Sequence, residues 1–213
     1  MNSNMTFPAP LSALAFLGLV VFLVLCLALT IRFAFGRKSK ALRATACIAL
    51  IGVCGYVALM LLFSVVSQTV VLASGQEKYF CEVDCHIAYS VVSAGAQPDP
   101  QIAGDTRYVV EVQTRFDPTT ISQRRRIGPL MPGPHEVLLI DKAGHEYRPA
   151  EVLGQSLMTP LRPGESYRTQ FIFEVQGMSP HPFLWLHTKT EVPYWGMIGN
   201  EISPLHRKVF FQL

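Results

Sequence analysis

Charged residues are missing from two long stretches near the start of this 213-residue chain. Residues 11–31 contain no Asp, Glu, Lys or Arg, and neither do residues 44–73. An apolar run of about 20 residues can cross a hydrocarbon layer about 30 Å thick, and it must be helical there because lipid offers the backbone no hydrogen-bond partners. The sequence therefore predicts two transmembrane helices, at residues 11–35 and 44–73.

A cleaved signal peptide is the alternative for the first apolar run. However, residues 1–10 carry no Lys or Arg, and no A-x-A-like cleavage site follows the run. The run is also longer than the apolar region of a signal peptide, which has about 7–15 residues. We therefore expect the first run to remain as an uncleaved anchor.

Acidic residues are absent before Glu77, whereas basic residues gather between and beside the two runs: Arg32, Arg37, Lys38, Lys40 and Arg43. Basic residues next to a span stay cytoplasmic, so residues 36–43 are expected to form a cytoplasmic loop. The N-terminal tail, residues 1–10, and a C-terminal domain, residues 77–213, then lie on the periplasmic or extracellular side of an inner or plasma membrane. The expected partners are the lipid bilayer and, as a further candidate, another membrane or envelope protein.

Signatures of nucleic-acid binding and of catalysis are also missing. The 13 basic residues beyond the loop face 15 acidic ones, so the outer domain lacks the dense basic face that nucleic acid requires. The chain has no glycine-rich phosphate loop and no H-E-x-x-H motif, and Gly154-Gln-Ser-Leu-Met158 lacks the closing Gly of a nucleophile elbow. The sequence therefore predicts a non-catalytic binding or assembly role without a cofactor.

Beyond Glu77 the apolar residues alternate with polar ones, as they do in half-buried strands. The pattern is clearest in residues 106–116 and 165–175, where every second residue is apolar or Thr. Shorter strands are expected at 136–140, 146–148, 183–186 and 207–213. Seven or so such strands with Pro and Gly between them are typical of a sandwich. The expected fold is two transmembrane α-helices plus an all-β antiparallel immunoglobulin-like sandwich.

Two segments of the outer domain resemble a known family. Residues 161–175 read LRPGESYRTQFIFEV, and residues 139–149 read LIDKAGHEYRP. Together they resemble the "L-x-P-G-E … FEV" strand entry and the "D-x-x-G-x-x-Y" strand of telokin-like, immunoglobulin-fold extracytoplasmic domains. The resemblance implies a fold and a location outside the cytoplasm. It implies no reaction.

Cysteine is scarce, and only Cys81 and Cys85 fall in the outer domain, directly before His86. Two thiolates and an imidazole are good ligands for copper(I) or zinc, so the alternative function is a copper-handling or thiol-redox protein. If residues 79–92 form one unbroken strand, the two cysteine Cα atoms lie about 13 Å apart. That separation excludes a disulfide and a shared metal. A bulge at 82–84 would reverse this conclusion, so core cysteines, a disulfide and a metal site all stay open.

Two loops contain candidate partner-contact residues. One carries three consecutive basic residues, Arg124, Arg125 and Arg126, which could contact lipid headgroups or an acidic partner. The other contains Tyr194, Trp195 and Met197, residue types that favour interfaces when exposed. For both loops the alternative is structural: a solvated loop in the first case, and a cover over the end of the sandwich in the second.

Overall fold

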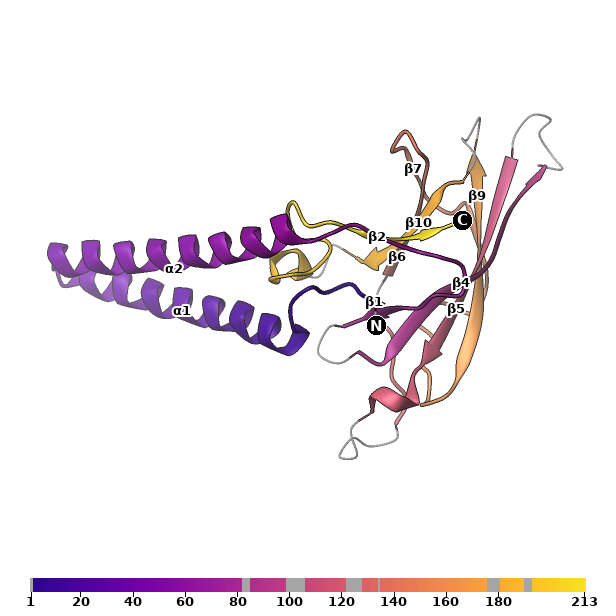
Figure 1. Ribbon diagram of the computed structural model, residues 1–213. Helices are drawn as coiled ribbons and strands as arrows, with labels where there is room; N and C mark the ends of the chain where they lie inside the picture. Colours follow the sequence, from indigo (N-terminus) through magenta and orange to yellow (C-terminus); the bar gives the residue numbers. More distant parts are fainter. Residues whose placement is uncertain are drawn as a thin grey trace.

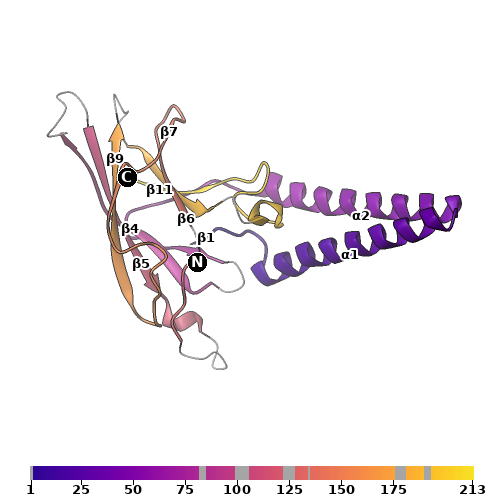
Figure 2. The ribbon, with the colours of Figure 1, turned by 180° about the vertical axis from the view of Figure 1, so that it is seen from behind.

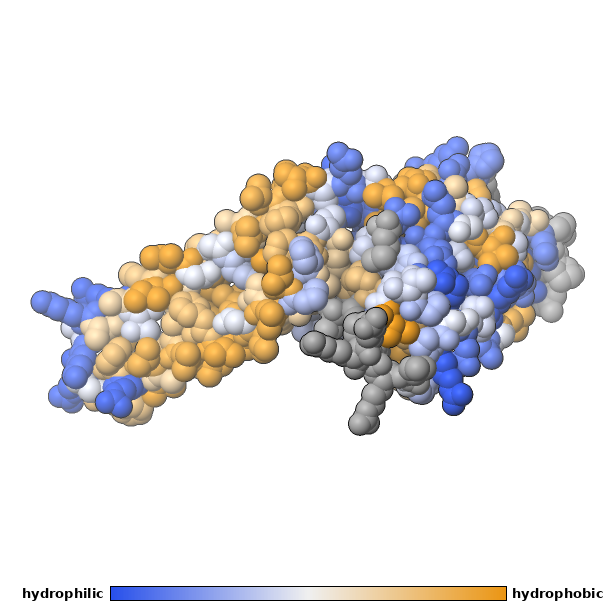
Figure 3. All heavy atoms as spheres, turned by 60° about the horizontal axis from the view of Figure 1, so that its bottom comes forward, coloured by the Kyte–Doolittle hydropathy of each residue, from blue (hydrophilic) through white to orange (hydrophobic). Residues whose placement is uncertain are grey.

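The computed structural model describes residues 2–81, 85–98, 106–121, 128–133, 135–175, 181–189 and 193–213. A hairpin of two long helices projects from one end of a β-domain (Figures 1 and 2). The surface of the helix pair is largely apolar along its length, with hydrophilic residues at its far tip, whereas the β-domain has a mixed surface (Figure 3).

The helix hairpin consists of α1, Ala9–Phe35, and α2, Ser39–Val66. Both helices are long and apolar enough to cross a bilayer. The chain reverses direction at residues 36–38, where Arg37 adopts a positive φ of 52°. The helices pack closely at Gly52, because a Cβ atom there would lie 2.5 Å from the Phe22 ring. Compared with the expected span at residues 44–73, α2 begins earlier, inside the expected loop of residues 36–43. It ends seven residues earlier than residue 73.

The β-domain contains two sheets (Figure 1). The larger has the order β1 (Asn2–Ser3), β3 (Lys78–Phe80), β4 (Ile87–Pro98), β5 (Thr106–Phe116), β9 (Ser166–Val175) and β8 (Glu151–Gly154). The smaller has the order β2 (Val70–Leu72), β11 (Val209–Gln212), β10 (Phe183–Thr188), β6 (His135–Ile140) and β7 (Glu146–Tyr147). Two short 3₁₀ helices, η1 (Pro118–Thr120) and η2 (Pro193–Gly196), lie in connections.

The sheets are mixed, so the expectation of an all-antiparallel sandwich is confirmed only in part. Strand β1 pairs in parallel with β3, and β2 pairs in parallel with β11, whereas the other strand pairs are antiparallel. Both parallel strands are short segments beside the helices. Their residues were expected to belong to the N-terminal tail and to the second span. The helix hairpin brings both segments to the same end of the domain, where each adds to a sheet edge.

The core between the sheets follows the alternation seen in the sequence. Along β5 the inward side chains include Val110, Val112 and Phe116, each with an exposed fraction of 0%. Along β9 the same alternation buries Tyr167, Phe171, Phe173 and Val175. Leu139, Leu184, Leu186 and Phe211 complete the core from the second sheet. Burying such side chains contributes roughly 1.5–3 kcal/mol each, which makes this core the main stabilising element of the domain.

A buried ion pair joins the two sheets at the end nearest the helices. Lys78 of β3 and Glu201 are both almost fully buried, with exposed fractions of 0% and 2%. Lys78 Nζ donates to Glu201 Oε2 at 2.8 Å and to the carbonyl oxygens of Leu186 at 2.6 Å and Val209 at 3.2 Å. Glu201 Oε1 lies 2.7 Å from the same nitrogen. The ammonium therefore uses all three protons, which is the condition for burying it.

A second polar cluster lies on the outer face of the larger sheet. Arg115 donates to Glu77 through Nε at 2.6 Å and through Nη2 at 2.8 Å, and Tyr79 donates its hydroxyl proton to Asp117 Oδ2 at 2.6 Å. The hydrogen bond from Tyr79 holds the pKa of the Asp117 carboxyl well below its usual range. The bonds from Arg115 lower the pKa of Glu77 in the same way.

Replacing Glu201 by Gln should strongly destabilise the domain, because Lys78 would be left buried without a counter-charge. Removing one partner of a buried pair typically costs about 3–5 kcal/mol in free energy of unfolding. Denaturant unfolding of the full chain in detergent measures this loss, with the exposed Glu151→Gln of β8 as the matched control. A loss in Glu201→Gln no larger than in the control would contradict the role assigned to the pair.

Acid should destabilise the protein through Asp117 and Glu77. Their folded-state pKa values lie below the unfolded values of about 3.9 and 4.3. Their contribution is therefore present above about pH 5 and is lost as the pH falls through the folded pKa values. Thermal unfolding between pH 6 and pH 2 should show a falling melting temperature, with a shallower fall in Asp117→Asn. The same flattening in the exposed Glu174→Gln would show that the effect does not belong to this cluster.

Candidate functional site

The cysteine motif forms a disulfide. Cys81 and Cys85 are bonded through their sulfur atoms, and their Cα atoms lie 4.3 Å apart. The unbroken strand considered for residues 79–92 is therefore wrong, because β3 ends at Phe80 and β4 begins only at Ile87. Residues 82–84, where a bulge was considered, lie outside the described residues. Of the three alternatives, the structure contains the disulfide.

The disulfide removes both thiolates from the metal set of Cys81, Cys85 and His86. The His86 ring instead packs parallel to Phe116, with centroids 5.6 Å apart, and its Nδ1 lies 2.7 Å from the Thr120 hydroxyl oxygen. Within the described ranges, no three His, Cys, Asp or Glu side chains are grouped as a metal would require. The copper-handling alternative therefore has no support in this geometry.

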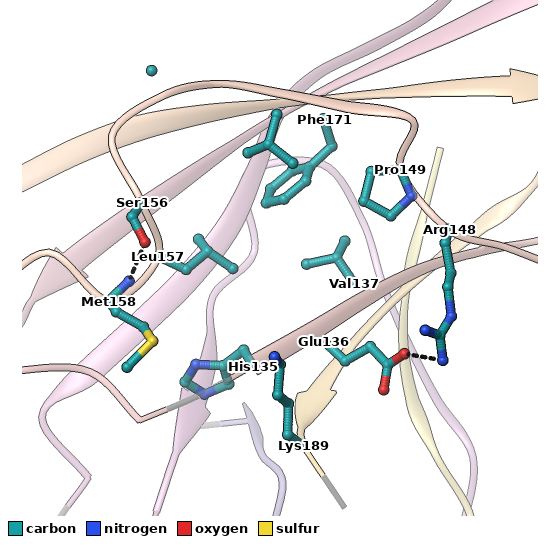
Figure 4. Close-up of a pocket in the computed structure, with 12 residues that line it drawn as sticks. His135, Glu136, Val137, Arg148, Pro149, Ser156, Leu157, Met158, Phe171 and Lys189 are labelled. Carbon is teal, nitrogen blue, oxygen red and sulfur yellow. Dashed lines mark hydrogen bonds and ion pairs between the residues drawn. The ribbon is translucent and has the colours of Figure 1, made fainter.

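A cavity of about 700 Å³ opens on another side of the domain, between the two sheets. Its walls come from β6, from the segment that follows β7, from β8 and the turn after it, and from β9 (Figure 4). The apolar part of the lining contains three buried side chains, Val137, Leu157 and Phe171, and two half-exposed ones, Val152 and Met158. The cavity is therefore an opening into the sandwich core with an apolar rim.

Close strand approach shapes the cavity wall formed by β8. Gly154 has a φ of 85°, and a Cβ atom there would lie 2.9 Å from the carbonyl oxygen of Arg168. Only glycine accepts this conformation without strain, and its small size lets β8 lie against β9. The turn after Gly154 then directs Leu157 into the cavity (Figure 4).

Polar side chains line the opposite wall of the cavity (Figure 4). Glu136 and the exposed Arg148 form an ion pair of 2.8 Å. Lys189 is exposed, and it makes no hydrogen bond or ion pair within the described part of the chain. Its ammonium group is therefore a positive charge at the cavity that remains available to a ligand.

His135 is the half-buried polar residue of this wall. Its Nδ1 lies 3.2 Å from the Tyr89 hydroxyl oxygen, and its ring packs edge-to-face on Phe80. Burial lowers the pKa of His135 to about 3, and the positive charge of Lys78 acts in the same direction, so the ring is neutral at physiological pH. Nε2 is buried without a hydrogen-bond partner among the described residues.

Sequence reasoning did not find this cavity. Its lining residues come from separate strands and turns between residues 135 and 189, and no motif connects them. The only signals were indirect: the isolated Gly154, and scattered histidines that included His135. The cavity exists because the chain crosses from the smaller sheet to the larger one between β7 and β8. This crossing is a feature of the tertiary structure, and no local sequence pattern marks it.

The two candidate contact loops have different outcomes. Arg124, Arg125 and Arg126 lie outside the described residues. The second loop, residues 193–206, which we call the wedge, lies against the part of α1 and α2 nearest the β-domain (Figures 1 and 2). The Tyr56 hydroxyl donates to the carbonyl oxygen of Gly196 at 2.7 Å, and a Cβ atom at Gly196 would lie 2.8 Å from the Phe16 ring.

The aromatic and Met residues of the wedge differ in their exposure to solvent. Met197 is buried, with an exposed fraction of 5%, and Tyr194 is half-buried. Trp195 has an exposed fraction of 53%. The structural alternative considered for this loop therefore accounts for Met197, whereas Trp195 remains available for an external contact.

Comparison with known proteins identifies no family for this chain. No protein-family model matches the sequence, and no curated protein matches it. Among solved structures, the chain is similar to MPT63, a secreted protein from Mycobacterium tuberculosis, with a TM-score of 0.42 and 14% identity. The match covers 68% of this chain and 98% of that protein. A likeness at this level supports no conclusion about activity, ligand or partner.

Proposed function

We propose that this chain is a membrane-anchored binding protein. Its two helices hold the β-domain on the outer side of an inner or plasma membrane, and the domain binds a ligand in the cavity between its sheets without catalysing a reaction. The observation that carries this proposal is the cavity, which combines an apolar interior with the exposed ammonium group of Lys189, unpaired within the described chain.

Two independent observations support the outer location of the domain. The basic residues of the first 76 positions lie at or near the turn of the helix hairpin, at the end opposite the domain. Cys81 and Cys85 of the domain are bonded, and structural disulfides persist in oxidising compartments outside the cytoplasm. Both features favour the same orientation, with residues 36–38 inside.

The lining of the cavity favours an amphiphile with an anionic head as the ligand. Val137, Leu157 and Phe171 offer an apolar floor, and burial of apolar ligand surface there contributes about 25 cal/mol per Å². Lys189 supplies a positive charge at the same cavity. A carboxylate with a long apolar chain would contact the apolar floor with its chain and Lys189 with its charged head.

The same lining supports a non-catalytic role. Ser156, the hydroxyl-bearing residue of the cavity, accepts a hydrogen bond from the backbone N–H of Met158 at 3.2 Å. No hydrogen bond connects its hydroxyl to His135 within the described segments. A serine nucleophile requires a base within hydrogen-bond reach, and this arrangement does not provide one.

The orientation predicts opposite labelling of two introduced cysteines. In intact cells, a membrane-impermeant maleimide should label Lys142→Cys, because Lys142 lies in an exposed turn of the β-domain. It should label Ser39→Cys, at the start of α2, only after the membrane is made permeable. Wild-type protein serves as the control for the native cysteines. The reverse pattern would place the β-domain inside the cell.

Ligand binding can be tested with a photoreactive decanoate on the full chain in nanodiscs. We expect crosslinks in the peptides that contain Val137 and Leu157. Val152→Trp should reduce the yield by about tenfold or more, because it fills the cavity mouth with a side chain from the exposed edge strand. Leu153→Trp is the matched control, since Leu153 is the next residue of β8 and does not line the cavity.

The charged head of the ligand is tested separately. Lys189→Met should weaken decanoate labelling about threefold to fivefold, because an exposed ion pair contributes up to about 1 kcal/mol. The same variant should leave labelling by a neutral decanol analogue unchanged, and Lys142→Met should affect neither probe. Equal labelling of Val152→Trp and Leu153→Trp, or crosslinks elsewhere in the chain, would refute the cavity as the binding site.

A further inference from the structure

The wedge lies beside the helices well below the outer end of α2. Phe22 and Gly52 are in contact, so these two residues lie at the same height on the hairpin. Gly196 contacts Phe16 and Tyr56, which lie about 9 Å and 6 Å further out at 1.5 Å per residue. Thus the tip of the wedge reaches the part of the hairpin that is apolar on all sides.

The height of the wedge can be compared with the thickness of a bilayer. Arg32 and Arg43 lie about 15 Å inward from the level of Phe22 and Gly52. If these arginines mark the inner boundary, a hydrocarbon layer about 30 Å thick is centred near Phe22 and ends near Ser12. The Ser12 hydroxyl donates to the carbonyl oxygen of Ile198 at 2.9 Å. The wedge therefore spans the outer boundary of the hydrocarbon layer.

The wedge presents no charge to its surroundings. Its sequence, PYWGMIGNEISPLH, contains one charged residue, Glu201, which is buried and paired with Lys78. In contrast, Trp195 is 53% exposed, and Leu205, which has a positive φ of 62°, is 72% exposed. An exposed tryptophan and leucine on an uncharged loop are unfavourable in water and favourable at the boundary of a bilayer, where Trp is enriched.

The backbone of the wedge is also adapted to a place without water. Non-helical backbone is tolerated at membrane depth only where other groups satisfy it. Tyr56 and Ser12 donate to the carbonyl oxygens of Gly196 and Ile198, and Ser203 donates its hydroxyl proton to Met197. Further bonds within the loop and with the N-terminal segment involve the backbone N–H groups of Met197, Asn200, Glu201, Ser203 and His206.

We infer that the wedge is seated in the outer leaflet of the bilayer, with Trp195 among the lipid chains near the headgroups. The partner of this surface is lipid. The β-domain is thus held against the membrane by the wedge as well as by the two helices. The inference rests on the proposed function in one respect, that the hairpin spans a bilayer, and it does not depend on the cavity or its ligand.

Tryptophan fluorescence tests the inference, because the chain has two tryptophans. Trp185→Phe leaves Trp195 as the reporter, and Trp195→Phe leaves Trp185, which is 7% exposed inside the β-domain. In nanodiscs whose lipids carry bromine on the acyl chains, we expect Trp195 to lose half or more of its emission. Quenching should be stronger with bromine near the headgroup than near the chain end. Trp185 should lose almost none.

A second measurement uses the wild-type protein, so its result does not depend on whether a tryptophan variant folds. Wild-type protein labelled with 5-fluorotryptophan gives two ¹⁹F resonances, and a spin-labelled lipid should broaden only that of Trp195. Unquenched Trp195 with red-shifted emission would place it in water, and unquenched Trp195 with blue-shifted emission would place it against protein. Either result, or equal quenching of both tryptophans, overturns the inference. Failure of the chain to enter nanodiscs would instead refute the membrane anchor.

Discussion

The structure depends on a single ammonium group that is fully removed from water. Lys78 lies in the larger sheet, its carbonyl partners Leu186 and Val209 lie in the smaller sheet, and its counter-ion Glu201 lies in the wedge. Because a buried charge without partners is costly, the ammonium group favours the state in which all three parts are in place. The pair therefore connects the position of the two sheets to the position of the loop that contacts the helices.

This connection makes the β-domain and the helix hairpin a coupled unit. Only three residues separate the end of α2 from the start of β2. The N-terminal segment before α1 lies between β3 and the wedge, with hydrogen bonds to Tyr79 and Gly199. Phe7 and Phe63 pack together at the outer ends of the helices, with ring centroids 4.9 Å apart. A domain attached in this way has a fixed height and direction relative to its helices, whereas one on a flexible linker would not.

The amount of this structure that could be predicted differs between its parts for physical reasons. The helices and the strands β5 and β9 follow from periodicity, which one segment of sequence carries by itself. Strand β2 could not be separated from the second span, since Val70, Val71 and Leu72 are as apolar as the helix before them. The pairing of Lys78 with Glu201, 123 positions apart, leaves no local pattern. The cavity likewise depends on the crossing between sheets. At Cys81 and Cys85, the disulfide interrupts an alternation that favoured a straight strand.

The place of β1 has a consequence for how the chain folds. Asn2 pairs with Lys78, and the backbone N–H of Glu201 donates to the carbonyl oxygen of Asn4, so the segment before α1 makes contacts 76 and 197 positions away in the sequence. Bringing such distant segments together has an entropic cost that grows with the length of the open loop. The helix hairpin, residues 9–66, makes up most of the chain between Asn2 and Lys78, so a formed hairpin shortens the loop that the pairing of β1 with β3 must close. A formed hairpin therefore lowers the entropic cost of pairing β1 with β3, so the helices contribute to the folding of the larger sheet as well as to its attachment.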